Sequence, residues 1–217
     1  LAVSQTLEAT MIQEERLILG GNTSLALGQT ATPSLAAVGT GGNLTAATKS
    51  VICIALGLQA YLDVVGMNNG GIGQIFDPAY SQVPGQIART NADGTTSTFG
   101  GGSARKSAAA PVTVVNGGSI TATVASTVGA VGYAWYMGAA GSEKLVAVTA
   151  INSVIIKDEP LSGAQLASSI TDQDNSQSAY DFDGLLIQAF KPNSKAYLKV
   201  MPTGTAGVGT KLSSDGA

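Results

Sequence analysis

The sequence predicts a mainly β protein, in which a β-sandwich lies between two flanking segments of different character. Three observations predict it: short runs of apolar and β-branched residues, glycine-rich turns between these runs, and no helical periodicity between one run and the next. We divide the chain into a helix and linker at 1–30, the sandwich at 31–160 with a long excursion at 59–107, and a return segment at 161–217.

The composition is apolar and poor in charge. Hydrophobic residues make up 44% of the 217 residues and charged residues 12%, which is roughly half the usual share. The net charge of -3 argues against sequence-specific nucleic-acid binding, which needs clustered lysine and arginine. The sequence lacks the apolar run of about 18 residues that a membrane-spanning helix needs, so we expect no membrane association. Low charge is typical of surfaces buried between identical subunits.

An amphipathic helix is expected at residues 1–19. Val3, Leu7 and Met11 share one of its faces, and acidic residues occupy the other. Gly20-Gly21 ends the helix, because glycine readily adopts the conformation that closes one. We expect the Val3, Leu7 and Met11 face to contact a neighbouring subunit.

The excursion contains a predicted β-hairpin, with strands at 86–90 and 96–99 around the turn Asn91-Ala92-Asp93-Gly94. Asp93 and Gly94 at its tip are the second pair of expected subunit contacts. The glycine run at 100–103 is interpreted as a flexible exit.

The sandwich strands follow from runs of β-branched and aromatic residues with turn residues between them. They are expected at 33–38, 50–58, 111–115, 119–124, 132–137, 144–150 and 152–157. Asn116-Gly117-Gly118 predicts a hairpin between the third and fourth of these strands. The expected sandwich core comprises Val51, Ile52, Ile54, Tyr133 and Trp135. Cys53, the single cysteine, is interpreted as a small core residue.

The aromatic strand has two possible uses. Alternation places Tyr133 and Trp135 on one face and Tyr136 on the other. An exposed aromatic face would bind a sugar or a protein partner, whereas a buried one would pack the core, and packing is favoured. In the return segment, residues 182–190 predict a short helix with Leu185, Leu186 and Phe190 inward, and 196–201 a strand.

The chemistry needed for catalysis is missing from the sequence. Without histidine, the chain has neither Ser-His-Asp nor Cys-His catalysis, and one cysteine cannot make a zinc site. Ser103 and Lys106 have the spacing of Ser/Lys acyl-transfer enzymes, but they follow a glycine-rich loop and lack partner motifs. Four carboxylates, those of Asp172, Asp174, Asp181 and Asp183, lack the spacing of a calcium loop, and a solvated acidic turn is favoured. We therefore expect no enzyme activity, cofactor or metal.

Four stretches carry a resemblance to known families. Val128-Gly129-Ala130-Val131-Gly132-Tyr133-Ala134-Trp135-Tyr136-Met137-Gly138 resembles a strand of fibronectin-type-III-like modules of phage and bacterial surface proteins. Residues 8–22, EATMIQEERLILGGN, resemble a helix of tailed-phage major capsid proteins that leads into such a module. Asp174-Asn175-Ser176-Gln177 and Phe182-Asp183-Gly184-Leu185-Leu186 resemble the return into the capsid domain.

The resemblance implies an Ig-like or fibronectin-III-like sandwich inserted in an α+β capsid domain of the HK97-like fold. It implies a virion protein, made in the cytoplasm of a host bacterium, that assembles with identical subunits and with other virion proteins. The inserted sandwich would project from the shell. A second function stays open, a phage tail or surface module that recognises a carbohydrate or receptor.

Overall fold

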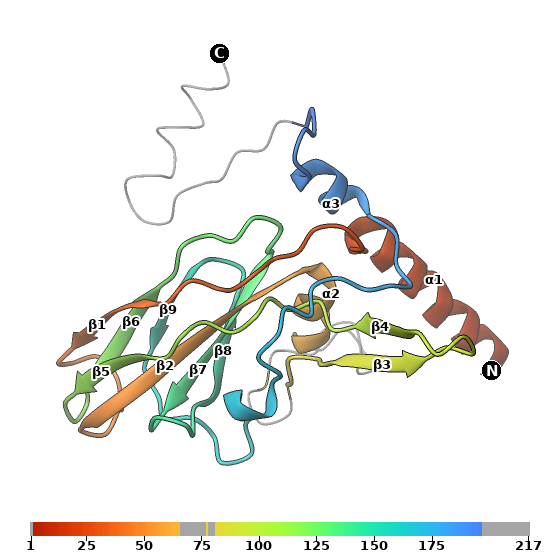
Figure 1. The fold of residues 1–217 in the computed structure, drawn as a ribbon. Coiled ribbons are helices and arrows are strands. Elements are labelled where there is room, and N and C mark those ends of the chain that lie inside the picture. The colour runs from red at the N-terminus through yellow and green to blue at the C-terminus, as the bar shows by residue number, and fades with distance from the viewer. Residues whose placement is uncertain (1, 66–76, 78–80, 197–217) are drawn as a thin grey trace.

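The computed structural model describes residues 2–65, 77 and 81–196. The strand expected at 196–201 lies almost wholly outside these residues. The described chain is mainly β with antiparallel sheets, as the sequence predicts (Figure 1). Its elements, in chain order, are α1 (Ala2–Gly20), β1 (Ser34–Val38), β2 (Ala47–Leu56), α2 (Leu58–Val64), β3 (Gln86–Thr90), β4 (Thr96–Gly100), β5 (Ala110–Val114), β6 (Ser119–Thr123), β7 (Gly132–Gly138), β8 (Lys144–Thr149), β9 (Ser153–Ile156), a 3-10 turn (Ala167–Ser169) and α3 (Leu185–Phe190).

Two antiparallel sheets pack face to face to form the body. One has the strand order β1-β6-β9 and the other β5-β2-β7-β8. If these seven strands are renumbered from 1 to 7 along the chain, the order of neighbouring strands is 1-4-7 in one sheet and 3-2-5-6 in the other. In an immunoglobulin constant domain the corresponding orders are 1-2-5-4 and 3-6-7. The strand pairing therefore does not follow the immunoglobulin constant-domain order.

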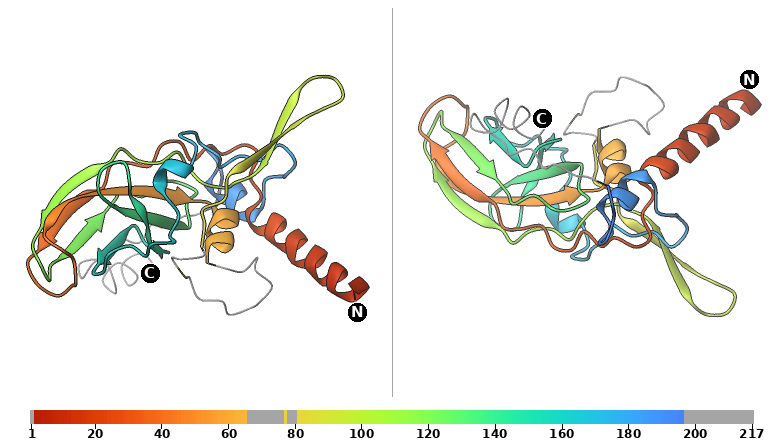
Figure 2. Two further views of the ribbon diagram at one scale, coloured as in Figure 1. Left: turned by 90° about the horizontal axis from the view of Figure 1, so that it is seen from below. Right: turned by 90° about the horizontal axis from the view of Figure 1, so that it is seen from above.

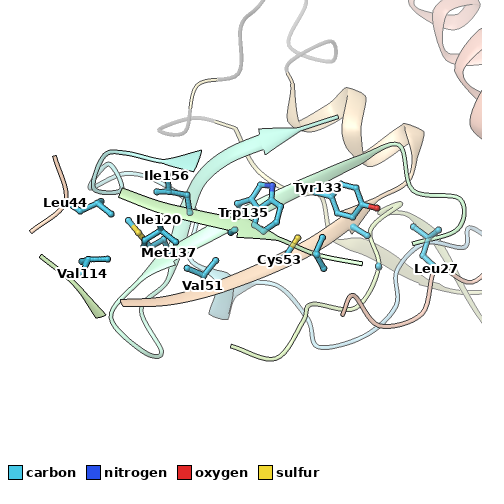
Figure 3. Packing of buried hydrophobic residues seen from close by; sticks show 14 residues of the cluster. Leu27, Leu44, Val51, Cys53, Val114, Ile120, Tyr133, Trp135, Met137 and Ile156 are labelled. Carbon is cyan, nitrogen blue, oxygen red and sulfur yellow. The ribbon is translucent and has the colours of Figure 1, made fainter. Parts of the chain in front are cut away.

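The core between the sheets is built on β2 and β7. Val51 and Cys53 from β2 meet Tyr133, Trp135 and residues of β6 and β9 in one buried cluster (Figure 3). Trp135 is fully buried, and its indole N–H donates a hydrogen bond to Thr149 Oγ1 at 2.9 Å. Because a buried aromatic side chain contributes large apolar area, this cluster stabilises the association of the two sheets.

A second core lies on the opposite face of the four-stranded sheet. Ile52 and Ile54 point into it, away from the other sheet, so their expected place in the sandwich core is corrected to this second cluster. Successive side chains of a strand point to opposite faces, and β2 is buried on both. The cover consists of α2, Val83 and the segment 161–170, the first part of the expected return segment.

The turn at Asn116-Gly117-Gly118 connects the two sheets and does not close a hairpin. β5 pairs with β2, whereas β6 pairs with β1 and β9. The turn bonds to another loop, since Ala46 N–H donates to Asn116 Oδ1 at 2.7 Å and Gly117 N–H to Leu44 O at 2.9 Å. The sequence signal identified the turn correctly but not the strands that pair across it.

Candidate assembly surfaces

Two arms leave the same end of the body in different directions, the helix α1 and the hairpin β3–β4 (Figure 2). They carry the five residues that the sequence analysis expected to contact other subunits. Val3, Leu7 and Met11 lie on α1, and Asp93 and Gly94 lie at the hairpin tip. The structure therefore places these residues on two separate surfaces.

The C-terminal turn of α1, residues 17–20, lies very close to the body, and glycines make this approach possible. A Cβ atom on Gly20 would lie 2.6 Å from the Leu58 Cβ of α2. A Cβ on Gly184 would lie 2.7 Å from the carbonyl oxygen of Leu17. Both distances are too short for any real Cβ, so these close approaches need glycine.

An ion pair joins α1 to α2 immediately before this C-terminal turn. Arg16 Nη1 lies 3.6 Å from Asp63 Oδ1, and the Arg16 side chain is only 8% exposed. Burial raises the pKa of Asp63, and the positive charge of Arg16 offsets part of this rise. The pair fixes the last turns of α1 on the body while the preceding turns extend away from it.

Asp183 holds the chain where it leaves α1. Its carboxylate accepts hydrogen bonds from the backbone N–H groups of Thr23 and Ser24, at 2.9 and 3.1 Å, and from both hydroxyls. Lys191, at the end of α3, forms an ion pair with the same carboxylate. Burial alone would raise the pKa of Asp183, but the lysine and these donors outweigh it and hold the pKa well below its usual range. The N-terminal linker and the return segment are thus joined at one side chain.

The preceding turns of α1 are exposed in the chain as described. Every residue from 3 to 15 is exposed. The exposed fractions of Val3, Leu7 and Met11 are 83%, 61% and 56%. Isolated helices of this length are marginally stable in water, and most helices in proteins are stabilised by packing one face. An exposed apolar ridge is a candidate contact surface.

The hairpin has a well-formed turn. Gly94 adopts φ +82°, a conformation that glycine reaches without strain. Asp93 Oδ1 accepts hydrogen bonds from the N–H and the hydroxyl of Thr95, at 2.9 and 2.6 Å, and these donors lower the pKa of Asp93. Both Asp93 and Gly94 are exposed. The tip is therefore a fixed turn available to another molecule.

The return segment contacts the hairpin mainly along β4, with further hydrogen bonds from Gln86 to Gln177 O and from the Tyr180 hydroxyl to Asn91 Oδ1. Ala179 N–H donates to Thr98 O of β4 at 2.8 Å, and the rings of Phe99 and Tyr180 pack edge to face with centroids 5.4 Å apart. No described segment pairs with the outer edge of β3, whose Ile87 is 58% exposed. A two-stranded ribbon is marginally stable alone, so this arm also favours a partner.

The glycine run after the hairpin is held firmly, contrary to the expected flexible exit. Gly100, Gly101 and Gly102 all have positive φ, and 101–104 are buried. Gly102 N–H donates to Asn175 O at 2.7 Å, and Gly102 O accepts from Gly57 N–H at 2.8 Å. Three left-handed residues in a row let the chain turn back along β2 in very little space.

The short helix α3 is oriented differently from the sequence prediction. Ile187 is its buried residue, whereas Leu185 is 63% exposed and Leu186 and Phe190 are half-buried. The helix is one and a half turns long, so helical periodicity defines its inward face poorly.

The acidic residues considered as calcium ligands are each used elsewhere. Asp172 pairs with Arg105 at 2.9 Å, Asp174 accepts from Gly28 N–H at 2.6 Å, and Asp183 binds Lys191. Among the described residues no group of three His, Cys, Asp or Glu side chains could hold a metal ion. These carboxylates join segments of the fold.

The other motifs with possible chemistry also have structural roles. Lys106 Nζ donates to the carbonyl oxygens of Ala167 and Ile170, and the Ser103 hydroxyl is fully buried. Cys53 is fully buried, which raises the pKa of its thiol and suppresses the reactive thiolate. Tyr133 and Trp135 pack between the sheets, and Tyr136 is buried on the opposite face with its hydroxyl 2.9 Å from Gln165 Oε1. The aromatic strand is therefore core, not a binding face.

An open groove lies between the end of the hairpin nearest the body, which includes Gln86 and Thr98, and the segment 165–175. It encloses about 610 Å³, and its lining includes Gln82, Gln86, Thr98 and Gln173, with the buried Ile170 beneath. Its walls carry amides and hydroxyls but no charged side chain. Such a groove suits an uncharged polar ligand better than an anion or a cation.

Comparison with known proteins gave no match to a family model, to a curated protein or to a solved structure. None of the helices in the described ranges is long and apolar enough to cross a membrane.

Sequence reasoning missed the residues that fix the arms. The sequence analysis gave no role to Arg16, and it assigned Asp183 only to an acidic turn. Nothing in their local sequence signals a partner more than 40 residues away, such as Asp63 for Arg16 or Thr23 for Asp183. The one available signal was the glycine at positions 20, 21 and 184, which is typical of close backbone approach.

Proposed function

We propose that this chain is a self-assembling structural subunit of a virus particle, a tailed-phage major capsid protein whose sandwich domain projects from the shell. The observation that carries the proposal is the pair of arms, each anchored at the body and largely exposed beyond it. A helix with an exposed apolar ridge and a two-stranded ribbon both extend from a well-packed body. Arms of this kind are typical of subunits that complete their packing on neighbouring copies.

The sequence resemblance supplies the narrower part of the proposal. It associates the α1 segment and the return segment with the capsid domain and the sandwich with an inserted module. The bonds from Asp183 to Thr23 and Ser24 agree with this, because they hold the two flanking segments together beside the sandwich. The partners are identical subunits and other virion proteins, and the site of action is the virion after synthesis in the bacterial host. The proposal includes no catalytic step, cofactor, nucleic-acid sequence readout or membrane contact.

The test is the oligomeric state of the intact protein and of two charge-matched variants. Leu7→Glu places a carboxylate in the apolar ridge, and Gln5→Glu adds the same charge on the far side of the helix. We expect sedimentation velocity to show large assemblies for the wild type and for Gln5→Glu, and small species for Leu7→Glu. A wild-type protein that stays monomeric at all concentrations would contradict the proposal.

The groove beside the hairpin favours a second function, recognition of an uncharged carbohydrate by a tail or surface module. Its neutral amide and hydroxyl lining is the specific observation. Titration of the monomer with neutral oligosaccharides tests it, with Gln173→Ala as the groove variant and Gln13→Ala on α1 as the control. Saturable binding that only Gln173→Ala weakens would favour this second function over the shell.

A further inference from the structure

We infer that α1 pairs with α1 of a second copy, antiparallel and centred on Leu7. This inference rests on the proposed function and names the partner of one of its two arms. Val3, Leu7 and Met11 are spaced four residues apart, so each lies one turn above the last with a drift of about 40° around the axis. They form a single ridge of the kind that packs beside an equivalent ridge at a crossing angle of about 50°.

The ridges of two copies of α1 match each other when the two helices run antiparallel. In an antiparallel pair centred on Leu7, Val3 faces Met11 of the second copy, Leu7 faces Leu7, and Met11 faces Val3. Each of the three ridge side chains then has an apolar partner. The contact is isologous, so the same patch serves both copies and a twofold axis passes near Leu7.

The charges on α1 select the antiparallel direction. The described part of the helix has no charged residue before Glu8, and its remaining acids, Glu14 and Glu15, are exposed in the second half. A parallel pair would bring each acid beside its own copy, which is destabilising. The antiparallel pair places Glu8 opposite Thr6, and no two acidic residues of the described helix then face each other. The electrostatic energy therefore favours the antiparallel pair.

The charges also argue against other occupants. Helices that lie on membranes carry lysine and arginine on their polar face. The only basic residue of α1 is Arg16, which is buried against Asp63. The exposed charges of the helix are all acidic, so an anionic lipid surface or a nucleic acid would be repelled. A second copy of the same ridge is the occupant that satisfies both the apolar and the charge pattern.

Cysteine crosslinking of the full chain tests the pairing. Each variant carries one new cysteine, Val3→Cys, Leu7→Cys, Met11→Cys or the far-side control Gln5→Cys, and Cys53 is too buried to react. Antiparallel pairing predicts disulfide dimers for Leu7→Cys alone and for Val3→Cys mixed with Met11→Cys, but not for Val3→Cys alone. A partner held in place acts at an effective concentration of ~1 mM, so at about 10 µM protein these links should form ~100-fold faster than those of Gln5→Cys.

The outcomes separate this inference from the proposed function. Crosslinking of Val3→Cys with itself would show a parallel pair and overturn the inference. Large assemblies in which no α1 position links faster than Gln5→Cys would also overturn it, while leaving the shell proposal standing. Crosslinked dimers that never grow larger would support the pairing and contradict the shell.

Discussion

Substitution of Gly102 by alanine should destabilise the fold strongly, because two separate costs arise at this residue. Its φ is +92°, where an L-residue is strained by about 1–2 kcal/mol. The new Cβ would also lie 2.9 Å from the backbone nitrogen of Ala60 in α2. Backbone cannot move away as a flexible side chain would, and forced shifts of this kind cost roughly 1–3 kcal/mol. The expected loss in unfolding free energy is therefore about 2–5 kcal/mol.

Gly28→Ala is the matched control for this experiment. Gly28 has φ +72°, but a Cβ added there meets nothing within 4 Å. Gly28→Ala should lower the unfolding free energy only by the cost of placing alanine at positive φ, about 1–2 kcal/mol. Urea denaturation followed by tryptophan fluorescence measures both, since Trp135 is the only tryptophan and is fully buried. Equal losses for the two variants would refute the reasoning, because they would show that the contact with Ala60 costs nothing.

Three further predictions concern the core, the Asp183 junction and the thiol. Trp135→Ala should cost about 3–5 kcal/mol of unfolding free energy, because it empties the centre of the sandwich. Urea denaturation followed by circular dichroism measures this loss, since the variant has no tryptophan left, and a loss under about 1 kcal/mol would contradict the described packing. The pKa of Asp183 is lower in the folded protein than its unfolded value of about 3.9. The stability that the Asp183 carboxylate contributes to the fold is therefore fully present above pH about 3.9 and is lost as the pH falls through the folded pKa. Acid titrations of stability should therefore be flatter for Asp183→Asn than for the wild type, and superimposable curves would contradict this assignment. Cys53 should react with a thiol reagent only as fast as the protein opens, and fast labelling under native conditions would show that it is not buried.

The sequence predicted well those features that depend on local pattern. The strands around Val51 and Trp135, the hairpin at 86–100 and the helix α1 follow from periodicity and turn residues, which act over a few positions. The sequence did not predict which strands pair with each other. Asn116-Gly117-Gly118 is a hairpin signal, yet the strands on either side join different sheets, β5 pairing with β2 and β6 with β1.

The second core shows a further limit. A strand buried on both faces gives a continuous apolar run, so the sequence could not show that Ile52 and Val51 belong to different cores. The cover over Ile52 includes α2 and the segment 161–170, whose short apolar runs resemble loops when read alone. The fixed conformation of Gly102 likewise depends on Asn175, a long-range contact that a glycine-rich sequence cannot reveal.

For the candidate site, the sequence identified both arms but not how they are anchored. Exposure of Val3, Leu7 and Met11 is consistent with the expected contact face, while the contact itself stays a prediction. The ion pair from Arg16 and the junction at Asp183 involve residues far apart in sequence, so they required the structure.

The most direct test of the central claim is electron microscopy of the intact protein in its native assembly. The account predicts closed shells in which the sandwich projects outward and helix α1 lies against a neighbouring subunit. A single dispersed particle with α1 in solvent, under conditions where the protein is functional, would contradict it.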